Sequence, residues 1–199
     1  SAGSEQHECG GGGNCNYSGS VYNGGLLFDC LTPFTLNSVK VYTDTEGERT
    51  VELVDENGEL VYDMLINIPE TDDNGYIIEL NWEIVEGNNY ILTTNTDMNN
   101  ENFGDNNPLL KRTTDGLPNF PYIIEDVVEI NEGYYNSGGN PGFSTDYYYY
   151  FYNWQINNDW NLGGTSCFSD PIEVNVIVNE SIPGCVDSNA CNYNETATF

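Results

Sequence analysis

The chain has 199 residues, of which 38% are apolar and 13% are aromatic. This composition is sufficient for one domain with a sizeable core, and it excludes intrinsic disorder of the whole chain. Only four residues are Lys or Arg, whereas 32 are Asp or Glu, which gives a net charge of -28. Such a charge repels phosphate-rich partners, so we exclude nucleic acids and anionic membranes as ligands.

The compartment is indicated by the cysteines. Six cysteines, with little lysine and much Gly, Asn, Thr and Tyr, are typical of an oxidised, extracellular protein. No stretch approaches the roughly 20 apolar residues of a membrane span, so we expect no membrane insertion. The opening sequence SAGSEQHEC lacks the features of a signal peptide, and we expect such a signal to have been removed or to lie upstream. We predict an extracellular or cell-surface location.

Strands follow one another along most of the chain. Val51 and Leu53 precede the turn sequence DENG, and beyond it apolar residues alternate from Leu60 to Ile68, which predicts a hairpin with one buried face. Further strand candidates are GLLFDC, LNSVKVYT, YIIELNW, NYILTTN, PYIIEDVVEI, the aromatic run STDYYYYFYNWQI and PIEVNVIV. About nine short strands with turn-rich connections, and no clear helical period, predict an all-β fold: an antiparallel β-sandwich, jelly-roll-like or Ig-like.

The two ends of the chain differ from this middle and resemble each other. CGGGGNC near the start and CVDSNAC near the end each enclose five residues between two cysteines, and Asn-Tyr follows both. We therefore predict a Cys/Gly-rich segment over residues 1–18, a β-sandwich module over residues 19–180, and the truncated start of a Cys-containing repeat over residues 181–199. Small, loop-rich, Cys-bearing ends of this kind suggest a modular chain.

Several stretches also resemble a known family. LTPFTLNSVKVYTDTEGERTVELVDENGELV, LNWEIVEGNNYILTTN, FPYIIEDVVEI and YYYYFYNWQI resemble a β-sandwich module of large secreted and surface proteins of Bacteroidota, many of them type IX secretion substrates. GCVDSNACNYNETATF resembles the first part of a short Cys-containing repeat in the same proteins, and SCFSDPIEVNVIV is similar to the closing strand of accompanying Ig-like modules. The resemblance implies an extracellular, multidomain context and carries over no catalytic residue.

The aromatic run allows two interpretations. In an extended strand, side chains alternate, so one face would hold Tyr147, Tyr149 and Phe151, and the other Tyr148, Tyr150, Tyr152 and Trp154. Trp154 with Ile156 marks the second face as core. The first face is either part of a central strand at the edge of the sandwich, or a flat platform for sugar rings built from Tyr147 and Tyr149 with Tyr134 and Tyr135.

Acidic, Asn-rich loops are candidates for Ca²⁺ binding, because Ca²⁺ takes six to eight oxygen ligands in a flexible shell. The candidate ligands are Asp97, Asn99, Glu101 and Asp105 in one loop, Asp72 and Asp73 in another, and Asp187 in the tail. Neither loop has the glycine of the EF-hand pattern. The alternative is that these side chains only form turns and solvate the surface.

The cysteines favour disulfides over a metal site. Cys9 with Cys15 and Cys185 with Cys191 are close enough in sequence to form small loops, which leaves Cys30 and Cys167 as a third pair, one of fifteen possible pairings. His7 is the single histidine and no close Cys pairs occur, so we exclude a zinc site.

Catalysis is not indicated. A Ser-His-Asp or Cys-His catalytic site would depend on His7, which lies in a Gly-rich terminal stretch. No two carboxylates stand out as the catalytic pair of a glycosidase. We predict a non-catalytic module for adhesion or recognition, with glycan as ligand. Two alternatives stay open: a spacer or repeating subunit of a cell-surface fibre that contacts neighbouring modules, and an accessory domain of a secreted hydrolase.

Overall fold

The computed structural model describes residues 15–113, 118–124, 126–158, 187, 189 and 191. The chain divides into two compact units, residues 1–164 and 165–199. The first unit contains all the strands and the helix described below, and the described residues of the second are Asp187, Asn189 and Cys191. In the described part of the chain no helix has the length and apolarity needed to cross a membrane.

The described elements are almost all strands. They are Cys15–Asn16 (β1), Tyr22–Cys30 (β2), Phe34–Val41 (β3), Gly47–Val54 (β4), Leu60–Ile68 (β5), Tyr76–Ile84 (β6), Gly87–Thr94 (β7), Arg112–Thr113 (β8), Tyr122–Ile124 (β9), Val128–Ser137 (β10), Asn140–Ser144 (β11) and Tyr152–Asn157 (β12), with one helix, Thr96–Phe103 (α1). The larger sheet has the order β11-β10-β2-β7-β4-β5, with β9 also paired to β10, and the smaller has the order β12-β3-β6. Strands β1 and β8 form a separate short ladder.

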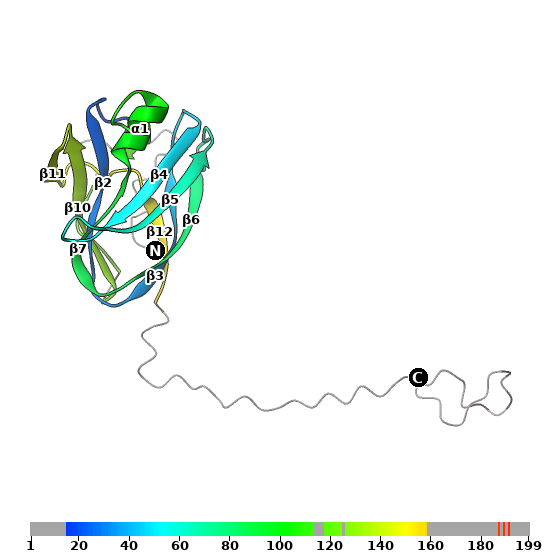
Figure 1. Cartoon of the computed structure of the whole chain (residues 1–199). Helices are drawn as coiled ribbons and strands as arrows, with labels where there is room; N and C mark the ends of the chain where they lie inside the picture. Colours follow the sequence, from blue (N-terminus) through cyan, green and yellow to red (C-terminus); the bar gives the residue numbers. More distant parts are fainter. Residues whose placement is uncertain are drawn as a thin grey trace. The chain divides into compact units, whose positions relative to one another are not determined.

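The two sheets pack face to face, as Figure 1 shows, with α1 at one end. Phe28 of β2 meets Trp154 of β12 edge to face, with ring centroids 5.0 Å apart, and Tyr62 of β5 stacks on Trp82 of β6 at 5.4 Å. Burying one large apolar side chain stabilises the fold by about 1.5–3 kcal/mol. These contacts confirm the predicted all-β, antiparallel sandwich, whose core lies between the sheets.

The hairpin predicted around DENG is confirmed as β4 and β5. Asp55 closes the turn, because its Oδ1 accepts hydrogen bonds from the backbone N–H groups of Asn57 and Glu59. Gly58 adopts a positive φ of 80°, which glycine tolerates without strain. Ile68 is buried at the end of the alternating face, whereas Leu60 at its start is 54% exposed.

The aromatic run differs from the predicted strand. Only Tyr152–Asn157 is β12, whereas residues 145–151 follow an irregular path in which Tyr150 has a φ of 66°. Alternation therefore fails: the side chains from Tyr148 to Tyr152 are all at most 3% exposed. The predicted placement of Tyr149 and Phe151 on a strand face opposite the core is wrong, because both side chains are buried in the irregular segment.

The structure also differs from the predicted strands between Pro121 and Ser144. PYIIEDVVEI is not one strand but two, β9 and β10, which pair with each other around a turn where Asp126 has a φ of 60°. The sequence that follows, which was not among the predicted strands, continues β10 to Ser137 and pairs with β11. The candidate strand PIEVNVIV lies outside the described residues.

Candidate functional site

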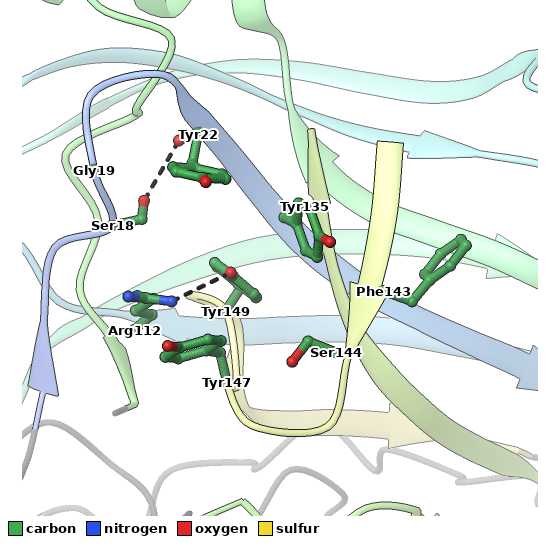
Figure 2. Close-up of a pocket in the computed structure, with 9 residues that line it drawn as sticks. All are labelled: Ser18, Gly19, Tyr22, Arg112, Tyr135, Phe143, Ser144, Tyr147 and Tyr149. Atoms are coloured by element: carbon green, nitrogen blue, oxygen red, sulfur yellow. Dashed lines mark hydrogen bonds between the residues drawn. The ribbon is translucent and has the colours of Figure 1, made fainter. Parts of the chain in front are cut away.

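A pocket of about 350 Å³ lies beside the aromatic run, at the β11–β10–β2 end of the larger sheet. It is lined by Ser18, Gly19, Tyr22, Arg112, Tyr135, Phe143, Ser144, Tyr147 and Tyr149. Figure 2 shows the guanidinium group of Arg112 beside the rings of Tyr147 and Tyr149, with Tyr22 and Tyr135 farther from it. The volume is within the range of about 300–1,000 Å³ that is usual for small-molecule sites.

Glycines on neighbouring strands lie against the tyrosines that line the pocket. In the strand register, Tyr135 of β10 lies between Gly24 of β2 and Gly142 of β11. A Cβ on Gly142 would lie 2.5 Å from Tyr135 Oη, and one on Gly24 would overlap the Tyr149 ring. A Cβ on Gly133 would collide with the backbone of Tyr147. The glycines thus allow the aromatic segment to lie directly on the sheet.

Buried hydrogen bonds fix this aromatic segment. The Tyr148 hydroxyl donates to the carbonyl of Phe151 at 3.0 Å, and Trp154 Nε1 donates to the same carbonyl at 2.9 Å. The Tyr150 hydroxyl lies 3.1 Å from Ser18 Oγ, and Asn107 Nδ2 in turn donates to Ser18 Oγ at 2.9 Å. Satisfied buried hydroxyls hold the chain in a single conformation, so the pocket walls are preorganised.

Arg112 is the charged residue of the lining. Its guanidinium carbon lies 3.6 Å from the centroid of the Tyr147 ring and 5.5 Å from that of Tyr149. Its Nη1 donates to the Tyr149 hydroxyl at 3.3 Å. Burial raises the pKa of Tyr149, although nearby Arg112 lowers it. Tyr149 therefore stays neutral at physiological pH and does not compensate the positive charge of Arg112.

Three of the four tyrosines predicted as a sugar platform meet at this pocket, namely Tyr135, Tyr147 and Tyr149. Tyr134 does not join them, because successive residues of a strand point to opposite faces. It lines a second, more polar pocket of about 270 Å³ that also contains Glu52 and Asp97. Burial raises the pKa of Glu52, whose Oε1 accepts a hydrogen bond from Asn95 at 2.7 Å.

The predicted calcium loop contains a helix. Asn95 caps the start of α1 by accepting a hydrogen bond from Met98 N, and Gly104 ends the helix in the left-handed conformation. Asp97 and Glu101 are exposed, whereas Asn99 is fully buried, with Nδ2 donating to Thr94 Oγ1 and to the carbonyl of Asn106.

The remaining calcium candidates take part in turns. Asp105 Oδ1 accepts a hydrogen bond from Asn107 N, Asp72 Oδ1 from Asn74 N and Asp187 Oδ1 from Asn189 N, and Asp73 is exposed. Among the described residues no three His, Cys, Asp or Glu side chains are grouped to hold a metal ion.

The cysteines differ from the predicted pairing in two of its three bridges. Cys15 is disulfide-bonded, whereas Cys30 and Cys191 are free thiols. The predicted Cys30–Cys167 and Cys185–Cys191 bridges are therefore not formed. Cys30 is buried at the end of β2, where its thiol donates to the carbonyl of Thr32 at 3.2 Å and burial raises its pKa to about 11. Cys9, Cys167 and Cys185 lie outside the described residues.

The sequence did not indicate Arg112, Tyr22 or Ser18 as site residues. A signal for Arg112 was its rarity, since only four basic residues occur in the chain. Two of the other three cations have clear structural partners: Arg49 is buried against backbone carbonyls, and Lys111 forms an ion pair with Asp44 at 2.6 Å. Comparison with protein-family models, curated proteins and solved structures gives no match to this chain.

Proposed function

We propose that this chain is a non-catalytic recognition module of a secreted or cell-surface multidomain protein and that it binds a glycan in the aromatic pocket. The observation that carries this proposal is the convergence of four tyrosine side chains from distant parts of the chain, Tyr22, Tyr135, Tyr147 and Tyr149, on one pocket. Sugar rings have apolar faces that stack on aromatic rings, while tyrosine hydroxyls can bond sugar hydroxyls.

A glycan array probed with the purified chain tests this proposal. Tyr147 is the side chain to remove, because it is only half-buried, whereas Tyr149 is 3% exposed and its loss would disturb the fold. We expect Tyr147→Ala to weaken binding at least tenfold with little change in the melting temperature. Tyr62→Ala, which removes a half-buried tyrosine from β5 at the other end of the sheet, is the matched control. Absence of binding by the intact chain to any glycan would refute the proposal.

A second candidate is a subunit of a surface fibre, and one observation favours it. In the described part of the chain β5 ends the larger sheet and pairs with β4 on one side only. Its outer face exposes Val61 (42%) and Leu65 (55%). An unpaired edge with apolar residues can accept a strand from another copy. Concentration-dependent assembly that Leu65→Lys abolishes would support this candidate over glycan binding.

A further inference from the structure

We infer that the aromatic pocket recognises an oxyanion on its ligand, a carboxylate or sulfate group of an acidic sugar, and that Arg112 is the residue that binds it. This inference rests on the proposed function and narrows it to one class of glycan. It starts from the hydrogen-bonding capacity of the guanidinium group, which carries five N–H donors in a planar fork.

Most donors of Arg112 are not used within the described part of the protein. Nη1 donates to Tyr149, and buried Nε has no hydrogen-bond partner among the described residues. No described carboxylate forms an ion pair with Arg112. Arg49 provides the contrast, because its Nε, Nη1 and Nη2 donate to the carbonyls of Pro108, Gly47 and Thr45. Arg112 is thus a charged group with spare donors, which is costly to bury unless a partner arrives.

The tyrosines hold the guanidinium plane in one orientation. Tyr147 contacts its face at 3.6 Å, and the Tyr149 hydroxyl accepts from one edge. A guanidinium group stacked in this way can present its other N–H groups to two oxygens of one oxyanion. Arg112 Nε is buried, and charge-assisted hydrogen bonds are stronger in such surroundings than at an open surface, because the dielectric constant is lower there.

The rest of the lining fits a sugar that carries the oxyanion. Among the described lining residues there is no Asp or Glu to repel an anion, although the chain has 32 of them. Tyr22 is 36% exposed and forms an edge-to-face pair with Tyr135 at 6.0 Å, which leaves aromatic surface for a pyranose ring. Ser144 accepts a hydrogen bond from Asp146 N, so its own hydroxyl proton can bond a sugar hydroxyl.

The test is an NMR titration of the full chain with four probes at constant ionic strength: D-glucuronate, D-glucose 6-sulfate, D-glucose and acetate. We expect one of the two acidic sugars to bind at least tenfold more tightly than glucose, and the tighter one identifies the oxyanion as carboxylate or sulfate. Arg112→Gln should reduce that affinity at least tenfold, and Arg112→Lys should restore only part of it, because Lys lacks the planar fork. Lys40→Gln, which changes the net charge equally outside the pocket, should have no effect.

The other possible results of this titration distinguish failure of the oxyanion inference from failure of the proposed glycan function. Equal binding of glucose and the acidic sugars, unchanged in Arg112→Gln, would overturn the oxyanion inference and leave glycan binding intact. Binding of acetate that depends on Arg112, without binding of any sugar, would overturn the proposed glycan function while locating an anion site. Absence of binding by all four probes would overturn the inference, and the glycan array then decides the proposed function separately.

Discussion

The ring of Tyr149 lies on the backbone of Gly24, in the space that a side chain on Gly24 would occupy. A Cβ there would lie 2.8 Å from Tyr149 Cγ, closer than real Cβ atoms come to other heavy atoms. The position of Tyr149 therefore depends on the absence of a side chain at Gly24 in β2. Arg112 depends on it in turn, because it donates a hydrogen bond to the Tyr149 hydroxyl.

Gly24→Ala should consequently displace Tyr149 and disturb the pocket. Overpacking of this kind costs about 1–3 kcal/mol of unfolding free energy, which urea denaturation measures. Gly19→Ala is the control, because its Cβ would lie 3.4 Å from Tyr22 Cδ2, an ordinary contact. Equal stability of the two variants would show that the Tyr149 ring moves at no cost.

Arg49 should matter for stability far more than Arg112. Arg49 is fully buried, its three nitrogens donate to carbonyls, and its guanidinium carbon lies 4.6 Å from the centroid of Phe103. Arg49→Met leaves those carbonyls without partners, so we expect a loss of about 3 kcal/mol or more in unfolding free energy. Arg112→Met removes the hydrogen bond to Tyr149 from a half-buried site and should cost less than about 1.5 kcal/mol. The two melting curves compared at neutral pH check this, and a reversed order would contradict it.

Substitution of Asn99 can distinguish a structural role of this side chain from a role in binding Ca²⁺. Its buried amide joins Thr94 to Asn106, so Asn99→Ala should lower the unfolding free energy by about 1–3 kcal/mol. The loss should be the same with excess Ca²⁺ and with chelator, as calorimetric unfolding in both buffers can determine. Glu101→Gln, at an exposed position of the same helix, is the control. A stabilisation by Ca²⁺ that either substitution removes would instead place the ion at this segment.

The buried tyrosines predict alkaline unfolding. Burial raises the pKa of Tyr148, Tyr150 and Tyr152 above the ordinary value of 10.0. Because the folded pKa is the higher one, their contribution to stability is complete below pH 10 and is lost as pH rises from there towards the folded pKa. Each such tyrosine lowers the unfolding free energy by about 1.4 kcal/mol per pH unit in that window.

Urea unfolding in steps from neutral pH to above pH 10 measures this slope. Tyr150→Phe removes one ionising group, so its curve should fall less steeply by about 1.4 kcal/mol per pH unit, despite lower stability at neutral pH from the lost bond to Ser18. Tyrosinate absorbance that rises fully before unfolding would contradict the burial of these hydroxyls.

The sandwich could be predicted from sequence because its regular hairpins follow local rules. Asp55 to Gly58 specify a turn, and the residues on either side alternate with period two. The aromatic segment does not follow such rules, because Tyr150 and Asn153 adopt positive φ values that shift the direction of later side chains. Its burial depends on glycines of other strands, a tertiary feature that no local pattern contains.

The site was predictable only in its residue types. An excess of tyrosine indicated binding, and Tyr135, Tyr147 and Tyr149 do line one pocket. Arg112 could not be placed there, since the short β1–β8 ladder and the bridge from Arg112 to Tyr149 connect parts distant in sequence. The burial of Asn99 could not be predicted for a related reason: its side chain, in a sequence typical of a loop, lies fully buried in a capped helix.

The bond between Ser18 and Tyr150 joins residues 132 positions apart at the edge of the pocket. Walls assembled from such distant parts exist only when the whole sandwich is folded, so a ligand of this pocket binds the native state and no partly folded form. At a hundredfold excess over its dissociation constant it adds about 2.7 kcal/mol to the free energy of global unfolding. Occupancy of the pocket would therefore protect every strand at once, including those far from the ligand, and would make the folded chain more resistant to proteases.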